Sequence, residues 1–352
     1  MIKEKKPPTN NNNSIDFQSS PILSLELQKQ IAVAVRQLQA GETVAFPTET
    51  VYGLGADISI PSAIRQIYEI KTRPTSHPLI VHFADISQLQ HWAKEIPKSA
   101  WKLASHFWPG PLTLILKRSQ HVPQNVTGGQ NTVGLRIPAH PVALALLNAL
   151  GAEKALAAPS ANRFGRLSPT TAAHVQDELG DKVQMVLDGG TCQVGLESTI
   201  VSFDNEDATV LRPGGIPISA LEAVLNNKIT LSNNRKSIVR APGTLASHYA
   251  PATPLEVCPT QTLWQRTQEL AAQNLCAAVI RWSVSISAHI TNNNIVQFSM
   301  PQEPTAYGNQ LYATLRQFDK KGFDRLLIEA PPGDPAWLAI TDRLQRACQK
   351  KS

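Results

Sequence analysis

Residues 41–56, GETVAFPTETVYGLGA, decide how the fold begins. The apolar run 44–46 predicts a short buried strand, which ends at Pro47 because proline has no N–H to donate to a neighbouring strand. Hydroxyl and carboxylate side chains follow at once, and Gly53 and Gly55 leave the backbone free to turn. Because open α/β sheets bind ligands where their strands end, this polar loop is a candidate ligand site. A plain tight turn after a strand explains the stretch equally well.

The bulk properties describe an ordinary globular protein. The chain has 352 residues, of which 42% are hydrophobic and 17% charged, and its net charge is +6. This length allows two domains with full cores, and the mild positive charge suits anionic ligands such as nucleotides or RNA. No apolar run of about 18 residues occurs, so no membrane span is predicted. The four cysteines are scattered without a CxxC pair, which predicts reduced thiols rather than a zinc site or disulfides.

Composition and periodicity divide the chain into four parts. Residues 1–20 have the Asn, Pro and Ser content of a disordered tail and lack the apolar segment of a secretion signal. Residues 21–227 alternate between helical and strand patterns and form the predicted main domain. Residues 228–254 show little periodicity and are the predicted linker. In residues 255–352, strands such as LEVC, AAVIRW and RLLIEAPP alternate with helices, which predicts a smaller domain with a parallel sheet.

Apolar periodicity also predicts the elements of the main domain. The predicted helices cover 24–40, 61–70, 85–96, a segment ending near 107, 140–150, 171–179 and 216–227. The predicted strands cover 44–46, 79–83, 112–116, 131–138, 155–160, 198–203 and 208–215. Prolines and capping residues support several helix starts, and glycines support several helix ends. Such alternation predicts an α/β sheet with helices packed against it.

The strand 131–138 has one apolar face and one face that suits a ligand. Thr132, Gly134 and Arg136 share the second face, where they offer a hydroxyl, a gap and a guanidinium in a row. This row is therefore the predicted floor of a ligand site. A buried Arg136 needs a partner, which is a carboxylate either of the ligand or of the protein.

Two further pairs are candidate contacts for an anion. Lys71 and Arg73 end a predicted helix, and both side chains can reach one polyanion. Ser160 and Asn162 follow an apolar strand, where hydroxyl and amide groups can hold phosphate or ribose oxygens. A solvated basic helix end explains the first pair equally well, and an ordinary turn explains the second.

The remaining candidates are weak when taken alone. A single histidine in an apolar strand, such as His82, is more often a hydrogen-bonded core residue than a ligand contact. Ser198 and Arg212 lie in predicted strands and neither is specific by itself. The sequence contains no P-loop, GxGxxG, nucleophile elbow or HExxH motif, so a bound nucleotide is not held by one of the common loops.

Taken together, the motifs resemble one family. The motifs that carry the resemblance are, in chain order, GETVAFPTETVYGLG, KTRPTSHPLIVHF, WPGPLT, TVGLRIP, APSAN, SPTT, DGG, ESTIV and LRPGG. Over about residues 24–227 this order resembles the YrdC-type threonylcarbamoyl-AMP synthases. PGTLASHYAP at 242–251, followed by a second α/β domain, resembles their two-domain form. The implied fold is a YrdC-like twisted open sheet with a concave basic cavity, plus a smaller Rossmann-like α/β domain.

The resemblance implies a nucleotidyltransferase. It would convert L-threonine, bicarbonate and ATP into threonylcarbamoyl-AMP and pyrophosphate. A downstream tRNA threonylcarbamoyl transferase would use this product to form threonylcarbamoyladenosine in tRNA, and the chain itself would bind tRNA weakly. The implied cofactor is Mg²⁺ carried by ATP, and the implied location is the cytoplasm without membrane contact. No protein metal ligand and no general base is assigned.

The resemblance also implies roles for individual residues. The residues implied to surround threonine are Thr50, His82, Arg136, Ala158 and Ser198. The residues implied to contact ATP are Arg73, His77, Thr132, Ser160, Ser168, Arg212 and Tyr249. The signature implied to be catalytic by holding phosphates is Lys71, Arg73, Ser160 and Asn162. Because Tyr249 lies beyond the main domain, segment 235–250 is predicted to act as a lid.

Two other functions fit the same fold. A carbamoyl-transfer enzyme of metal-centre maturation would normally carry extra domains and zinc-finger cysteines, neither of which is present in these 352 residues. A module that binds double-stranded RNA or tRNA without chemistry is compatible with the net charge, although it needs a broad exposed basic patch. Threonine-dependent release of pyrophosphate distinguishes the synthase from the RNA-binding module.

Overall fold

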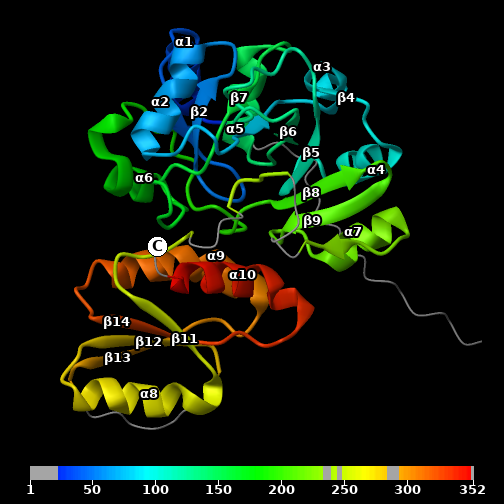
Figure 1. Ribbon diagram of the computed structural model, residues 1–352. Coiled ribbons are helices and arrows are strands. Elements are labelled where there is room, and N and C mark those ends of the chain that lie inside the picture. The colour runs from blue at the N-terminus through cyan, green and yellow to red at the C-terminus, as the bar shows by residue number, and fades with distance from the viewer. Residues whose placement is uncertain (1–22, 233–238, 244–247, 284–292, 350–352) are drawn as a thin grey trace, which may run out of the picture.

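The chain folds into two parts, each with its own sheet. The computed structural model describes residues 23–232, 239–243, 248–283 and 293–349. The predicted tail and much of the predicted lid lie outside these ranges. Within them, one part contains a ten-stranded mixed sheet and the other a four-stranded parallel sheet, each with helices against it (Figure 1). The predicted α/β class, with a large sheet followed by a smaller one, is confirmed.

The large sheet runs in the order β1, β2, β7, β3, β6, β5, β8, β9, β10, with β4 paired to β5. Its strands are β1 (Val44–Phe46), β2 (Gly53–Asp57), β3 (Ile80–His82), β4 (Ala93–Lys94), β5 (Leu112–Arg118), β6 (Thr132–Arg136), β7 (Leu156–Ala157), β8 (Thr199–Asp204), β9 (Asp207–Arg212) and β10 (Thr230–Leu231). The β3–β6, β5–β8 and β9–β10 pairs are parallel and the others antiparallel. Because β10 lies within the predicted linker 228–254, the first linker residues extend this sheet.

Helices cover the large sheet. They are α1 (Leu25–Gln39), α2 (Pro61–Lys71), α3 (Leu89–Trp92), α4 (Lys98–Phe107), α5 (Pro141–Leu150), α6 (Ala172–Leu179) and α7 (Ile218–Leu225). Short 3-10 turns precede α3 at Ile86–Gln88 and follow α6 at Gly180–Lys182. Helices α1 and α5 pack on each other in a separate apolar cluster that also buries Phe46 of β1. No helix in the described ranges has the length and apolar character needed to span a bilayer.

The predicted helix 85–96 is wrong in its last four residues. The helical geometry stops at Trp92, and Ala93–Lys94 instead form β4, which pairs with the end of β5. Pro97 disfavours helical geometry at the residue before it, so the helix cannot continue to its predicted end. Pairing with a strand edge therefore overrides the apolar periodicity of this segment.

The glycines of the opening stretch serve a strand and not a turn. Gly53–Asp57 form β2, which runs antiparallel to β1, so the polar loop is limited to residues 47–52. A Cβ on Gly55 would lie 2.7 Å from the Phe46 ring, closer than any real contact. Glycine is therefore required here because a neighbouring side chain lies against the backbone.

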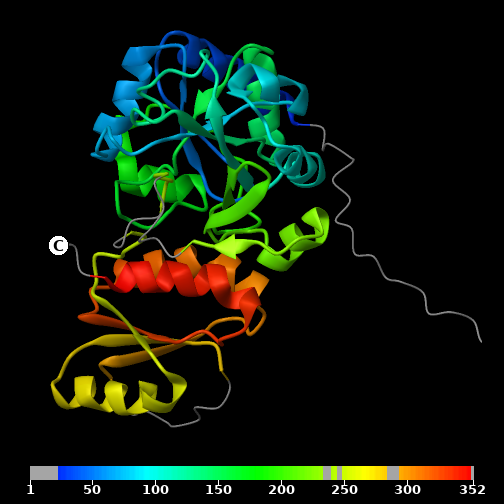
Figure 2. The same ribbon diagram turned by 45° about the vertical axis from the view of Figure 1, so that its right-hand side comes forward.

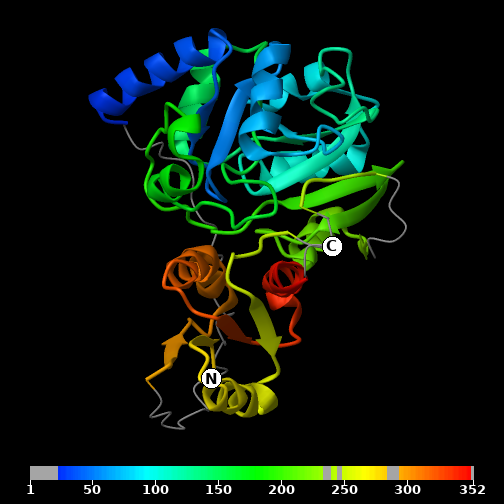
Figure 3. The same ribbon diagram turned by 60° about the vertical axis from the view of Figure 1, so that its left-hand side comes forward.

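The second sheet has the parallel order β11, β14, β12, β13. Its strands are β11 (Leu255–Cys258), β12 (Ala277–Arg281), β13 (Ile295–Ser299) and β14 (Arg325–Glu329), and its helices are α8 (Thr260–Ala272), α9 (Pro304–Asp319) and α10 (Leu338–Cys348), the last preceded by a 3-10 turn at Pro335–Trp337. Figure 2 and Figure 3 show α9 and α10 on the face toward the large domain and α8 on the opposite face. The small parallel-sheet domain predicted for the C-terminal part is therefore present.

The two domains share an apolar cluster. Val51 and Leu167 of the large domain pack in the same buried cluster as Tyr307 and Leu311 of α9. Ion pairs surround this contact, including Arg316–Glu178 at 3.0 Å. The helices α9 and α10 thus join the second sheet to the large domain through a continuous core.

Replacing Gly55 by alanine is expected to lower the free energy of unfolding by about 1–3 kcal/mol, because the added methyl group would overlap the Phe46 ring. Gly333 is the matched control, since nothing lies within 4 Å of its Cβ position. The Gly333→Ala variant should be as stable as the wild type or slightly more stable. Chemical denaturation of both variants measures the difference, and equal midpoints would contradict a close approach at Gly55.

Candidate active site

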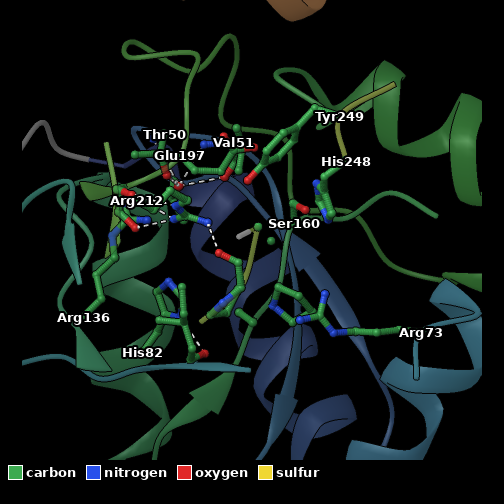
Figure 4. A pocket seen from close by; sticks show the side chains of 18 residues that line it. Thr50, Val51, Arg73, His82, Arg136, Ser160, Glu197, Arg212, His248 and Tyr249 are labelled. Carbon is green, nitrogen blue, oxygen red and sulfur yellow. Dashed lines mark hydrogen bonds between the residues drawn. The ribbon is translucent and has the colours of Figure 1, made fainter. Parts of the chain in front are cut away.

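A pocket of about 570 Å³, its open mouth included, lies where strands of the large sheet end against the segment that leads to the second domain. Its lining combines the 47–52 loop, Arg73 after the end of α2, the ends of β3, β6 and β9, the loop after β7, the residues before β8, and the described residues of the predicted lid segment 235–250. The described lining residues are Thr48, Thr50, Val51, Gly53, Arg73, Ile80, His82, Arg136, Ala158, Pro159, Ser160, Glu197, Ser198, Arg212, Pro242, Gly243, His248 and Tyr249 (Figure 4).

The pocket is positively charged. Arg73, Arg136 and Arg212 line it, and Glu197 is the one carboxylate among its described lining residues. Figure 4 shows Arg73 and Arg136 entering from different sides of the view, with Tyr249 and His248 standing next to each other. Buried cations in excess of anions favour an anionic ligand, since a charge away from water requires a partner. The predicted concave basic cavity is therefore present.

Arg136 has a protein carboxylate as its partner. Its Nη2 lies 2.6 Å from Oε1 of Glu49, and both side chains are only 5% exposed. The second oxygen of Glu49 accepts the backbone N–H of Ala139 at 2.9 Å. Glu49 thus neutralises Arg136 from behind, while Arg136 itself faces the pocket. Of the two partners left open by the sequence, the structure contains the protein carboxylate.

His82 is a neutral histidine at the end of β3. Its Nδ1 lies 3.2 Å from the carbonyl oxygen of Ile80, and the imidazole contacts the edge of Phe46. Burial, with the charge of Arg136 added, lowers the pKa of His82 to about 3. The ring therefore offers hydrogen bonds to a ligand but no positive charge at neutral pH.

Arg212 ties the strand ends to the segment before the second domain. Its Nη2 donates to the carbonyl oxygen of Ser198 at 2.8 Å, and its Nη1 donates to that of Pro242 at 2.9 Å. The hydroxyl of Ser198 in turn lies 2.8 Å from Thr113 Oγ1. This network fixes a guanidinium and a hydroxyl at the pocket wall.

Arg73 reaches the pocket and Lys71 does not. Lys71 ends α2 with its Nζ 2.5 Å from the carbonyl oxygens of Ser160 and Asn162, so it shapes that loop from behind. Burial and the neighbouring charge of Arg73 lower the pKa of Lys71. Arg73 donates to the carbonyl oxygen of Pro78 at 2.8 Å, and its buried Nε has no hydrogen-bond partner in the described part of the chain.

Two family models together match most of the chain. The Sua5/YciO/YrdC model, described as telomere recombination, matches residues 36–214, and the model for the C-terminal domain of threonylcarbamoyl-AMP synthase matches residues 216–349. The chain belongs to the threonylcarbamoyl-AMP synthase family. As such it is an enzyme of the synthase class predicted from its motifs, in the two-domain form.

Relatives of this synthase match it over nearly its whole length. The threonylcarbamoyl-AMP synthase of Pyrococcus abyssi is 38% identical over 90% of this chain and 94% of its own, and that of Bacillus subtilis is 40% identical over 90% and 92%. The crystal structure of P. abyssi Sua5 complexed with L-threonine superposes with a TM-score of 0.82 at 37% identity, covering 91% of this chain and 94% of the other.

The pocket unites most of the residues singled out in the sequence. The predicted residues that line it are Thr50, Arg73, His82, Arg136, Ala158, Ser160, Ser198, Arg212 and Tyr249. They come from strands and loops far apart in the chain and include every residue implied to surround threonine. The roles of these residues remain predictions, whereas their common location is now established.

The predicted ligand floor on β6 is interrupted. Arg136 lines the pocket, but side chains of Ile80 and Ile115 lie 3.3–3.4 Å from the Cβ position of Gly134 and cover the expected gap. Thr132 lines a separate cavity on the far side of these isoleucines. The alternation along the strand was right, but apolar side chains from the neighbouring strands fill the middle of the row.

Three other predicted contacts also lie outside the pocket lining. Asn162 turns its amide toward the carbonyl oxygens of Arg163 and Arg166, which holds the loop after β7 in shape. His77 packs edge-on against Phe164. Ser168 is fully buried behind the pocket, where its hydroxyl donates to Glu197 at 2.6 Å.

Sequence reasoning missed several residues at this site. Glu197 gave a signal, because a carboxylate directly precedes an apolar strand. Arg343 also gave one, because it occupies the same helical face as Ile340 and Leu344, where an apolar residue is expected. His248 lies in a segment without periodicity, and no local pattern marks it as a lining residue.

Replacing Glu49 by glutamine is expected to lower the free energy of unfolding by about 3 kcal/mol, because it leaves the buried Arg136 without a countercharge. The matched control is Glu95→Gln, which removes an exposed partner of Lys117 and should leave the stability unchanged within error. Denaturant unfolding of both variants at pH 7.5 provides the comparison. A Glu49→Gln variant as stable as Glu95→Gln would mean that the Arg136–Glu49 pair is not needed for folding.

Buried and half-buried histidines with lowered pKa values predict a loss of stability in acid. Burial, followed by nearby cationic charge, lowers the pKa of His82 to about 3 and that of His174 to about 4, and lowers the pKa of His248 strongly. In the unfolded chain these groups titrate near 6.5, so below that pH the unfolded state binds protons that the folded state rejects. Stability should therefore decrease as the pH falls from about 6.5 toward 4.

The variant His174→Gln tests this account away from the pocket. It removes one of these titrations, so the free energy of unfolding should depend less steeply on pH between 6.5 and 5 than in the wild type. Urea unfolding at a series of pH values measures the slope. An unchanged slope would show that His174 is protonated to the same extent in both states.

Proposed function

We propose that this pocket is where the synthase joins L-threonine, bicarbonate and ATP. The observation that carries the proposal is the convergence of Arg73, Arg136 and Arg212 on one pocket whose only described lining carboxylate, Glu197, is already paired with Arg343. The site thus has cationic groups available for a carboxylate and a polyphosphate. Arg136 is already paired with Glu49, but Arg73 and Arg212 have no ion-pair partner among the described residues, and an apolar substrate or a cation would leave their charges uncompensated.

The side of the pocket around Arg136 suits threonine. Arg136 offers donors for the substrate carboxylate, and neutral His82 offers a ring nitrogen without a competing charge. The hydroxyls of Thr50 and Ser198 can pair with the polar groups of the amino acid, and Ala158 leaves space for its methyl group. The complex of the P. abyssi relative with L-threonine, at 37% identity, supports this choice of substrate.

The side around Arg73 and Arg212 suits the phosphates of ATP. Arg73 has a buried Nε that lacks a partner among the described residues, and Ser160 lines the same pocket. Lys71 and Asn162 act indirectly in this proposal by holding the loop. Tyr249 would contact the nucleotide with its side chain. His77, Thr132 and Ser168 lie outside the pocket lining, so they would contact ATP only if the ligand extended beyond the pocket or the chain moved.

The proposed reaction needs positioning more than covalent participation by the protein. The threonine amine and bicarbonate give a carbamate with loss of water, the carbamate oxygen attacks the α-phosphorus of ATP, and pyrophosphate leaves. Arg136 fixes one end of the attacking molecule, while Arg73 and Arg212 neutralise charge on the phosphates as it shifts to the leaving group. Burial of these guanidinium groups strengthens the effect, because the local dielectric is low.

Mg²⁺ is proposed to enter with ATP. Among the described residues there is no cluster of three His, Cys, Asp or Glu side chains that could hold a metal ion. Glu197 and Glu49, the carboxylates at and behind the pocket, are each engaged by an arginine. Phosphate oxygens and water are therefore the ligands that fit Mg²⁺ here, and the ion would neutralise phosphate charge.

The product is an activated carbamoyl group that must be passed on. We propose that a tRNA threonylcarbamoyl transferase in the cytoplasm consumes it, and that any binding of tRNA to this chain is weak. The arginine-lined pocket supports a small anionic ligand over the alternative of a plain RNA-binding module, because duplex RNA needs a broad basic surface.

The full chain, incubated with ATP, L-threonine, bicarbonate and Mg²⁺, is expected to release pyrophosphate only when threonine is present. Omission of bicarbonate after degassing should lower the rate. A coupled pyrophosphate assay measures the reaction, with serine in place of threonine as a control for the substrate. Binding of duplex RNA without threonine-dependent release would instead support the RNA-binding module.

Arg136→Lys is expected to weaken threonine binding by about tenfold, because lysine keeps the charge next to Glu49 but loses the forked donor geometry. The charge balance behind the pocket is preserved, so the variant should fold. Isothermal titration calorimetry with threonine gives the affinity. Wild-type affinity in this variant would argue against Arg136 as the carboxylate site.

A further inference from the structure

The carboxylate of Glu197 joins the pocket to the C-terminal domain. It precedes β8 and lines the pocket, and it accepts the Ser168 hydroxyl at 2.6 Å. From α9 the Tyr312 hydroxyl lies 3.0 Å from Oε2, and from α10 the Arg343 Nε lies 2.7 Å from the same oxygen. A side chain of the large domain that lines the pocket is thus bound by two side chains of the second domain.

Glu197 has a structural role and is a poor general base. Burial alone raises the pKa of a carboxyl group, but the charges of Arg343 and Arg212 and the Ser168 hydrogen bond outweigh this effect, and the pKa of Glu197 is lowered. The group is therefore ionised at neutral pH and has little affinity for a proton from the substrate. Its chemistry in this arrangement is to hold Arg343 and Tyr312 in place.

Arg343 is held in one orientation. Its side chain is 1% exposed, and besides the bond to Glu197 its Nη2 donates to the carbonyl oxygen of Pro213 at 2.9 Å. Its Nη1 lies 2.5 Å from Asp342. With both ends of the guanidinium engaged, its central carbon lies over the face of the Tyr249 ring, 4.9 Å from the ring centre.

Tyr249 requires such support. Its φ of +60° is a left-handed backbone conformation, which is unfavourable for an aromatic residue. The ring stacks on Tyr312 at 5.9 Å between ring centres, and the preceding N–H of His248 bonds to the backbone of α10. Its buried hydroxyl lines the pocket and has no hydrogen-bond partner among the described residues. An unpaired buried hydroxyl that faces a pocket is ready to bond to a ligand.

We propose that Arg343 and Tyr312 are positioning residues, through which the C-terminal domain aims the Tyr249 hydroxyl at bound ATP. The proposal rests on the proposed function, in which Tyr249 contacts the nucleotide. The cation–π contact from Arg343 and the ring stack from Tyr312 hold the Tyr249 side chain in one position. Glu197 in turn holds Arg343 and Tyr312 in place by hydrogen bonds to both. The second domain therefore completes the ATP side of the site, while the threonine side consists of residues of the first domain.

The test uses the full chain with Arg343→Lys, Tyr249→Phe and both substitutions together. Arg343→Lys keeps a positive charge next to Glu197 but removes the planar guanidinium group that packs against the Tyr249 ring. We expect it to weaken binding of α,β-methylene ATP with Mg²⁺ by about tenfold, and Tyr249→Phe to do the same. Because both changes remove the same contact, the double variant should bind no more weakly than the weaker single variant within about twofold. Threonine affinity should change in none of the three.

A second interface arginine provides the matched control. Arg316 is buried on α9 and bonds to Glu178 across the same interface, but it contacts neither Glu197 nor Tyr249. Arg316→Lys should leave the affinity for the ATP analogue within about twofold of the wild type. Calorimetry measures all affinities without turnover, and thermal unfolding of each variant shows that it is folded.

Several outcomes would overturn the proposal. Wild-type affinity for the ATP analogue in Arg343→Lys, or losses that multiply in the double variant, would exclude action through Tyr249. An equal loss in Arg316→Lys, or a parallel loss of threonine binding, would indicate a general loosening of the interface. A wild-type chain that binds no ATP analogue would overturn the proposed function and this assignment together, which distinguishes it from failure of the Arg343 role alone.

Discussion

Burial of charge is the constraint on which this structure depends. A pocket that binds anions away from water needs cationic side chains, and a buried charge is costly until it has a partner. Arg136 is paired with Glu49, and Lys71 is surrounded by backbone carbonyl groups. Glu197 is compensated by Arg343 from another domain. The fold around the pocket is in large part the set of elements that bring these partners together.

The same pairings make the pocket rigid before it is occupied. Arg212 joins the start of β8 to Pro242, and the Lys71 ammonium joins the end of α2 to the loop after β7. Groups held in this way need little reorganisation when charge shifts during a reaction. Tyr249 itself stacks on Tyr312 of α9 and lies against Arg343 of α10, so the second domain contributes to its position. The strand ends and loops of the large domain are thus held by contacts within that domain, whereas Tyr249 is also held by contacts from the second domain.

Local sequence patterns predicted much of the fold, because helix stripes and buried strands depend on nearby residues. They failed where distant pairing decides the structure, as at Ala93–Lys94, which join β5, and at Gly53–Asp57, which form β2 against Phe46. The strand ends and ordered motifs located most of the pocket. The partners of its charges, Glu49 for Arg136 and Arg343 for Glu197, stand 87 and 146 residues away in the chain, and no local pattern assigns them to each other.

The apolar cluster shared by the two domains has a consequence for how the molecule comes apart. Val51 and Leu167 lie in one buried group with Tyr307 and Leu311, so separating the domains would expose both sets to water. We therefore expect the two sheets, each with its own helices, to unfold as a single cooperative unit. Heat or denaturant should then unfold the arginine-lined pocket and the second sheet in one transition, and damage to α9 or α10 should disturb the pocket as well.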